Sequence, residues 1–321
     1  MNMLSNSITN HTTNHEVTPM TNLTAPQVST PSPQVATPSI ASSAMLVELS
    51  ISRWTAMKLD KRASSDVTSQ NYAQKGAARV NKSLLGGCAE LDAIKKLTGN
   101  VRNMHYAMTM PWSDTGLRLL PTTQYFKYHQ AMTEMQAEFN RMVTDFLDAY
   151  DWEISQAQAT LGALFNRDEY PTRDKLISKF GFRLSYIPLP DAGDFRIDVG
   201  TEATEKLRLE YDTFYRNQLE SALSDVWHRT YEALSRMSER LDWNDGKKIF
   251  RDSLVENLTD MVEMLRACNV TGDTQMTAMA DQLDTALRGV TPEGLRTNES
   301  ARIRTKAAVD KAIANLPSLD I

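Results

Sequence analysis

Three potential metal ligands share one face of a predicted helix in the second half of the chain. His228 has Asp225 three residues before it and Glu232 four residues after it, and side chains at these spacings meet on a helix surface. Imidazole and carboxylate groups so placed can bind a divalent cation. Because Arg229 lies among them, we expect ion pairs on a solvated helix face here instead of a metal site.

A second set of carboxylates surrounds a loop that contains proline and glycine. Asp191, Asp194 and Asp198 lie close together in the sequence, and carboxylate oxygens are ligands that Ca²⁺ prefers. Their spacing departs from the EF-hand pattern, and aspartate is also a favoured turn residue because its side chain bonds to the nearby backbone. We therefore expect a turn, with Pro190, Asp191 and Asp194 as candidate contacts for a protein partner.

Another loop, from Pro111 to Gly116, carries a tryptophan among polar residues. A tryptophan on a surface loop can be a hot spot of a protein interface. The alternative, which we favour, is an indole buried against a long helix. Trp112 and Asp114 complete the set of candidate interaction residues.

The motifs of the common catalytic classes are missing. The sequence has no phosphate-binding P-loop, no dinucleotide-binding glycine pattern, no nucleophile elbow and no zinc-protease histidine pair. The two cysteines, Cys88 and Cys268, are too few for a disulfide framework or a cysteine-rich zinc site. Both fall in helical patterns, where we expect buried free thiols. We expect no catalytic residue, no cofactor and no metal.

A predicted β-hairpin over residues 182–199 positions the candidate residues near Pro190. Apolar and polar side chains alternate on both sides of the loop, which is the period of a strand with one buried face. A strand near residues 46–54 shows the same alternation. Because a two-stranded hairpin is marginal alone, we expect the earlier strand to complete a small antiparallel sheet.

Helices dominate the rest of the chain. Two long amphipathic helices are predicted over residues 122–165 and 201–241, where apolar residues recur every three or four positions. Two helices of similar length on either side of the hairpin pack most simply as an antiparallel, coiled-coil-like pair. Shorter helices are predicted over residues 64–74, 84–110, 246–268, 273–288 and 300–315. The predicted fold class is therefore mainly α (α+β).

Composition divides the chain into three parts. Residues 1–44 are rich in Ser, Thr, Asn and Pro, and Glu16 is their only Asp, Glu, Lys or Arg. Such a segment cannot bury enough apolar surface to fold, so we expect a disordered tail. Residues 45–290 are predicted to form the helical domain with its small sheet, and residues 291–321 a C-terminal helix and tail.

Charge and hydropathy narrow the expected location and partners. The net charge is −5 and no long Lys/Arg run is present, so binding to a nucleic-acid backbone has no electrostatic signature. No apolar run approaches the roughly 18 residues that span a bilayer. The N-terminus also lacks the pattern of a signal peptide. We expect a cytoplasmic protein with no membrane partner.

Several stretches together give the domain a recognisable signature. They are residues 46–54, residues 110–121 with the run Met110-Pro111-Trp112-Ser113-Asp114, residues 180–182 with 190–196, and residues 250–258. Over about residues 45–290 the chain resembles an uncharacterised family of tailed-bacteriophage proteins, a domain of unknown function. The resemblance supplies no catalytic residues. It implies a phage or prophage origin, and partners such as an AAA+ ATPase similar to the cobalt-chelatase small subunit and a protein with a von Willebrand A-like domain.

Three functional hypotheses follow. The leading one is a non-enzymatic phage accessory protein, an adaptor in a multi-protein assembly in the bacterial host cytoplasm. The second is a structural component of the virion or of its assembly. The third, an enzyme or nucleic-acid-binding protein, requires convergent buried carboxylates or a basic groove.

Overall fold

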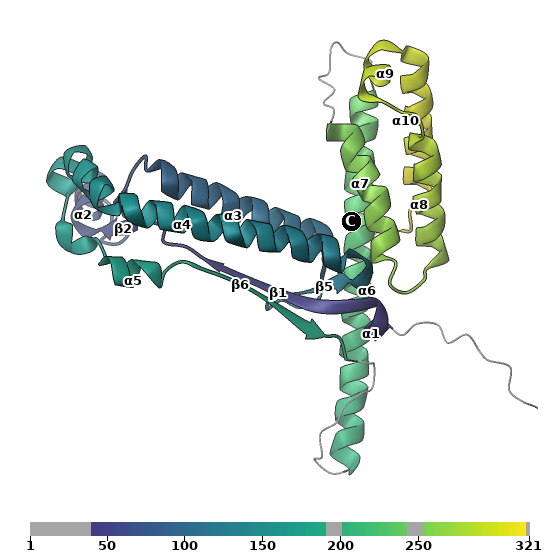
Figure 1. Cartoon of the computed structure of the whole chain (residues 1–321), viewed down its shortest axis with the longest axis horizontal. Helices are drawn as coiled ribbons and strands as arrows, with labels where there is room; N and C mark the ends of the chain where they lie inside the picture. The colour runs from purple at the N-terminus through teal and green to yellow at the C-terminus, as the bar shows by residue number, and fades with distance from the viewer. Residues whose placement is uncertain (1–39, 191–200, 243–252, 319–321) are drawn as a thin grey trace, which may run out of the picture. The chain divides into compact units, whose positions relative to one another are not determined.

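The computed structural model of the protein describes residues 40–190, 201–242 and 253–318. They belong to one compact unit, Pro38–Ile321, which is mainly helical with a small antiparallel sheet (Figure 1). The mainly α prediction is confirmed. The predicted tail lies outside the described residues except at its end, where residues 40–44 form a short helix and the first residue of a strand. None of the helices in the described part combines the length and apolar character needed to cross a membrane.

The helices of the described residues are α1 (Ile40–Ser43), α2 (Lys61–Gln70), α3 (Ala89–Met108), α4 (Tyr125–Leu161), α5 (Arg173–Ile177), α6 (Thr201–Leu241), α7 (Ser253–Cys268), α8 (Thr274–Leu287), α9 (Pro292–Thr297) and α10 (Glu299–Ala314), with 3₁₀ helices at Thr122–Gln124, Gly162–Leu164 and Arg167–Glu169. The strands are β1 (Ala44–Ser52), β2 (Met57–Asp60), β3 (Val80–Ser83), β4 (Met110–Pro111), β5 (Leu117–Pro121) and β6 (Gly181–Pro188). Both long helices match the predictions, as do α8 and α10. The start of the helix predicted over residues 246–268 lies outside the described residues.

The main sheet is antiparallel with the strand order β4-β5-β1-β6. β1 pairs with β6 from Met45 opposite Pro188 to Ser52 opposite Gly181, which confirms that the first strand joins the hairpin segment. The second hairpin strand lies outside the described residues. β5 was not predicted, because its short and nearly continuous apolar run does not alternate between apolar and polar residues.

Successive residues of the sheet enter two different hydrophobic cores. Leu46 and Leu119 face each other across β1 and β5 and lie in a core with α6 to α10. Val47 and Leu120 lie in a second core with α3, α4 and α5. All four side chains are at most 6% exposed. Because strand side chains alternate between faces, one short sheet separates the two cores.

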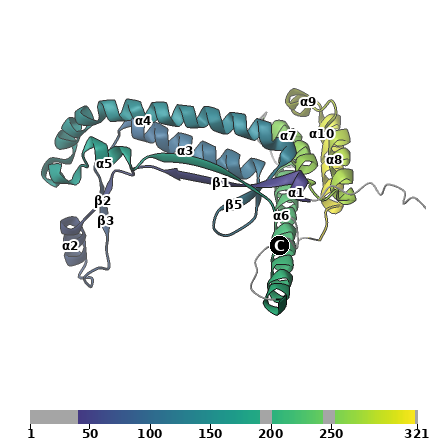
Figure 2. The ribbon, with the colours of Figure 1, turned by 60° about the horizontal axis from the view of Figure 1, so that its bottom comes forward.

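Helices α3 and α4 run alongside β1 and β6 (Figures 1 and 2). Phe146 of α4 is fully buried. Its ring lies 6.3 Å from Trp54 and 5.7 Å from Phe180, measured between ring centroids. Aromatic pairs at this range add attraction beyond the area that they bury. This aromatic cluster fixes the middle of α4 over the sheet.

The two long helices do not form the predicted antiparallel pair. The buried face of α4 packs on α3 and the sheet, whereas α6 packs on α7 and α10 in the other core. An amphipathic stripe shows which face of a helix is buried, but not which surface covers it. α10, predicted as part of a C-terminal segment, contributes Val309 and Ala312 to the same core as α6.

Residues 57–83, here named the α2 lobe, contain a second sheet in which β2 pairs antiparallel with β3. Neither strand was expected, and the helix predicted over residues 84–110 begins only at Ala89. Lys82 of β3 holds the lobe to the segment after α4, because its ammonium lies 2.8 Å from Glu169 and 3.5 Å from Asp60. The hydrogen bond to Glu169 is the main reason why the pKa of Lys82 is raised.

Candidate functional site

Trp112 packs inside the chain. The side chain is 5% exposed, and its ring meets Tyr215 of α6 edge to face, with 5.3 Å between centroids. Asp114 in the same turn is exposed, and Gly116 has a φ of 102° that suits glycine. The favoured interpretation of a buried indole is therefore correct, and Asp114 is left as the solvent-facing candidate of this turn.

The other predicted contacts belong to a different part of the sheet. Pro190 is exposed after the buried Leu189, and Asp191 and Asp194 lie outside the described residues. The strand pairing shows that the two loops lie at different points along the sheet. The turn at residues 112–116 leads into β5 at Leu117, which pairs with Glu48 of β1. The other loop leaves β6 after Pro188, opposite Met45. The two loops therefore start from different positions along β1.

Arg229 of α6 binds the C-terminal end of α3. Its guanidinium donates to the carbonyl oxygens of Tyr106, Ala107 and Thr109 at 3.0, 3.3 and 3.0 Å. It also pairs with Asp225 one turn earlier on α6. The last carbonyls of a helix lack partners within it and carry the negative end of its dipole. A cation at this position therefore stabilises the helix end and attaches α6 to it.

Arg118 of β5 reinforces the same contact. It donates to the hydroxyl and carbonyl oxygens of Thr109 at 2.6 and 2.9 Å, and its guanidinium lies 4.9 Å from the centre of the Tyr106 ring. Burial lowers the pKa of Arg118. We name Arg118 and Arg229, with the backbone that they bind, the arginine joint. It links α3 of one core to α6 of the other.

The three histidines in the described part have different partners. The Nδ1 atom of His129 lies 3.0 Å from the hydroxyl of Tyr186. His105 is 3% exposed, and its Nδ1 lies 2.7 Å from the hydroxyl of Tyr128. Burial, assisted by Arg118, lowers the pKa of His105 to about 4, so the ring is neutral near pH 7. His228 lies 3.6 Å from Glu232 on the surface of α6. The expected ion pairs on this face are present, since Asp225 pairs with Arg229.

Both cysteines are buried free thiols, as expected. Around Cys88, however, a group of potential ligands converges that sequence reasoning missed. The ligand atoms of Cys88, Glu90 and Glu153 all lie within 4.8 Å of one another. Glu153 is distant in the sequence and reaches the other two only because α4 packs on α3, so spacing along the chain could not reveal the group.

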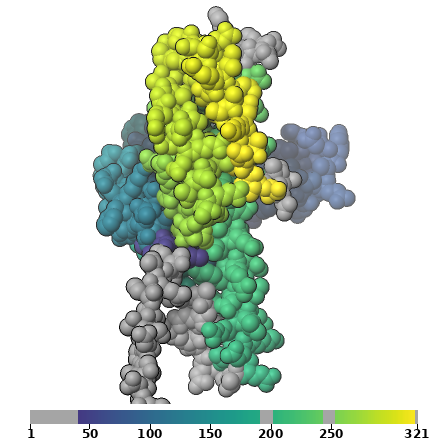
Figure 3. All heavy atoms as spheres, turned by 90° about the vertical axis from the view of Figure 1, so that its right-hand side faces the viewer, coloured from purple at the N-terminus to yellow at the C-terminus, as the bar shows by residue number. Residues whose placement is uncertain are grey.

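The first turns of α6 are different from the rest of that helix. No side chain of residues 202–214, which we name the α6 arm, is buried, whereas burial starts at Tyr215 and recurs up to Leu241. Leu209 and Phe214 are 65% and 46% exposed. In Figure 3 the yellow-green C-terminal helices cover the upper part of α6, and its darker green N-terminal part is visible below them.

The α2 lobe is basic although the whole chain is acidic. It contains six Lys or Arg and two Asp, a net charge of +4, against −5 for the chain. A pocket of about 490 Å³ between α2 and the following loop is lined by Lys61, Lys75, Arg79 and several hydroxyl side chains, with no acidic residue. Tyr72 in the same loop is 99% exposed. The basic residues are spread over the lobe, so no Lys/Arg run marks it in the sequence.

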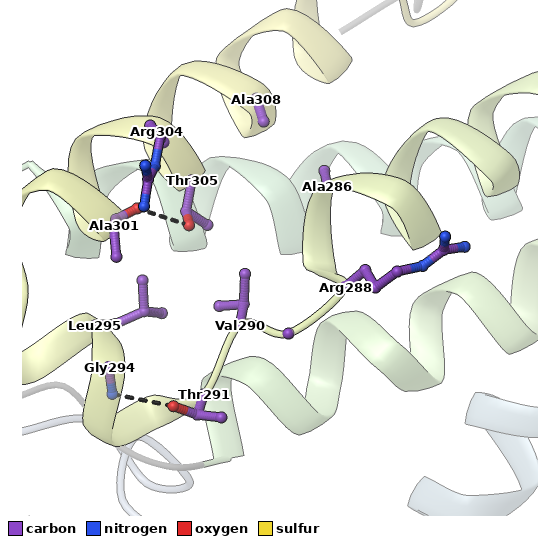
Figure 4. Close-up of a pocket in the computed structure, with 11 residues that line it drawn as sticks. Ala286, Arg288, Val290, Thr291, Gly294, Leu295, Ala301, Arg304, Thr305 and Ala308 are labelled. Carbon is purple, nitrogen blue, oxygen red and sulfur yellow. Dashed lines mark hydrogen bonds between the residues drawn. The ribbon is translucent and has the colours of Figure 1, made fainter.

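A pocket of about 340 Å³ lies among α8, α9 and α10 (Figure 4). Its lining is mostly small side chains and backbone, with Arg288 and Arg304 as its charged residues. Local capping shapes it, since the Thr291 hydroxyl accepts a hydrogen bond from the Gly294 amide at 3.1 Å. General acid–base catalysis needs a proton donor or acceptor that titrates near working pH, and this lining offers none.

Comparison with models of protein families, with curated proteins and with solved structures gives no match to this chain.

Proposed function

We propose that the protein is a non-enzymatic accessory protein of a tailed bacteriophage, an adaptor in a multi-protein assembly in the cytoplasm of the bacterial host. The partner class, an AAA+ ATPase together with a von Willebrand A-like protein, rests on the family resemblance of residues 45–290. The proposed docking surface rests on the α6 arm.

The observation that carries the proposal is the exposure of the α6 arm. Leu209 and Phe214 are large apolar side chains of the arm and are 65% and 46% exposed. Exposed apolar side chains that gather on one short segment often mark an interaction site. This apolar surface is available to an apolar groove of a partner, the mode in which amphipathic helices are often recognised.

Co-purification from infected cells tests the proposal. The double variant Leu209→Gln with Phe214→Gln removes apolar surface from the arm and keeps a good helix former. The matched control is Ile303→Gln on α10, because Ile303 is 60% exposed and Leu209 is 65% exposed. Tagged wild type and control should retain the ATPase, and the double variant should lose it. Wild-type chain that emerges alone and monomeric would contradict an adaptor, and abundant peptides in purified particles would favour a virion component.

The α2 lobe favours a second candidate function, binding of single-stranded nucleic acid. Basic grooves that follow the phosphate backbone, together with exposed aromatic rings on which bases stack, are the usual means of such binding. Lys75, Arg79 and Tyr72 supply both elements within one loop. Fluorescence anisotropy with a labelled oligonucleotide tests it. Lys75→Glu with Arg79→Glu should abolish salt-dependent binding, and a wild-type chain that does not bind at low salt refutes this function.

A further inference from the structure

We infer that Cys88, Glu90 and Glu153 form a binding site for one divalent transition-metal ion of the zinc class. Cys88 is the residue before the first turn of α3, and Glu90 lies in that turn. Glu153 reaches the same point from α4. The site therefore joins the N-terminal end of α3 to α4, through side chains that are all in the described part of the chain.

The spacing of the ligand atoms fits a tetrahedral ion. Zinc–sulfur and zinc–oxygen bonds of about 2.3 and 2.1 Å imply sulfur–oxygen separations of about 3.6 Å at tetrahedral angles. The Cys88 thiol lies 3.5 Å from Oε2 of Glu90. All three ligand atoms lie within 4.8 Å of one another, so small side-chain rotations bring the third into range.

Glu153 is the observation that points to a ligand. The residue is only 9% exposed, and its carboxylate lies within 4.8 Å of both the Cys88 sulfur and a carboxylate oxygen of Glu90. Two carboxylates this close repel each other when both are ionised. A cation between the three groups would offset that repulsion.

The donor set indicates which ions fit. A thiolate selects zinc-like ions over Mg²⁺ and Ca²⁺, which require oxygen ligands. Burial and the two carboxylates raise the pKa of the Cys88 thiol to about 12, so it is protonated before an ion binds. On binding, the S–H bond breaks, a metal–sulfur bond forms and the proton leaves to solvent. Three protein ligands leave a fourth position for water.

Metal binding to the purified full chain, freed of affinity tag and stripped with chelator, tests the site. Titration with ZnCl₂ against a chromophoric chelator gives stoichiometry and affinity, and CoCl₂ reports thiolate ligation through its ultraviolet charge-transfer band. We expect one tightly bound equivalent and a cobalt–thiolate band. Cys88→Ser should abolish the band, and Glu153→Gln should weaken zinc binding by at least about tenfold.

Cys268→Ser is the matched control, because Cys268 is also a buried free thiol but lies on α7 in the other core. It should bind zinc and cobalt like the wild type. Glu90→Gln should also weaken zinc binding. Because Glu90 is only half-buried, this variant separates a loss of zinc binding from a loss of folding. Absence of a cobalt–thiolate band in the wild type, or its loss in Cys268→Ser and not in Cys88→Ser, would overturn the inference.

Discussion

Replacing Arg229 by alanine should weaken the attachment of α6 to α3. Hydrogen bonds to a charged group each contribute about 1.5–3 kcal/mol. The bonds to the carbonyls of Tyr106 and Ala107 are exposed, so water can replace them. The carbonyl of Thr109 keeps its bond to Arg118. The remaining loss corresponds to about one charged hydrogen bond, so we expect Arg229→Ala to lower the free energy of unfolding by about 1.5–3 kcal/mol.

Urea denaturation measures this loss as a shift of the midpoint at constant slope. Arg229→Lys should recover less than half of it, because an ammonium cannot replace a planar fork that serves several acceptors. Arg236→Ala is the control on the same helix, since Arg236 makes an exposed ion pair with Glu232 that contributes less than about 1 kcal/mol. Equal costs for Arg229→Ala and Arg236→Ala would refute the arginine joint, as would a lysine variant as stable as wild type.

Three further predictions concern stability. Tyr72→Gly should raise the free energy of unfolding by about 1 kcal/mol, because this 99% exposed residue has a φ of 50° after the end of α2, where glycine is preferred; chemical denaturation checks it. Trp112→Ala should lower the free energy of unfolding by about 3–5 kcal/mol, because it removes a buried indole. Trp152→Ala, at an exposed position, should lower it by less than about 0.5 kcal/mol. Equal losses in chemical denaturation would contradict the burial of Trp112. The lowered pKa of His105, about 4, lies below the unfolded value of about 6.5. Its stabilisation is therefore complete above pH 6.5 and is lost as the pH falls towards 4. A His105→Gln variant should lose less stability over that range, and parallel pH profiles would contradict this.

Local features of the fold were predictable because they depend on local patterns. The alternation of Val47, Leu49 and Ile51 marks a strand, although it does not show that the opposite face enters a second core at Leu46. The regular apolar spacing of α4 and α6 marks long amphipathic helices. Asp273 caps α8 by accepting hydrogen bonds from the amides of residues 275 and 276, which a turn sequence before a helix indicates.

Which surface packs against each long helix was not predictable in the same way. The apolar stripes of α4 and α6 are both real, but each is covered by shorter helices and the sheet, not by the other stripe. β2 and β3 have only four residues each, and β3 has a single apolar residue, so the alternation in β2 is too short to indicate a strand by itself. Their position depends on Lys82, whose ion partners are Asp60 and Glu169.

The candidate sites show the same limit. A single tryptophan in a polar loop is compatible with a buried side chain and with a contact for a protein partner. Only the contact of Trp112 with Tyr215 shows that the side chain is buried. The approach of Glu153 to Cys88 depends on how α4 packs on α3. The α6 arm follows a uniform helical pattern, so its exposure depends on where α7 and α10 end.

Hydrogen exchange of the chain alone and in complex with the partner that co-purifies from infected cells tests the adaptor proposal most directly. The arm amides can be followed separately from those of the buried part of α6, which serve as an internal reference. We predict slower exchange across residues 202–214 in the complex and unchanged exchange between Ala222 and Leu234, which are fully buried in the free chain. An intact complex in which the arm exchanges as fast as in the free chain would contradict docking through α6.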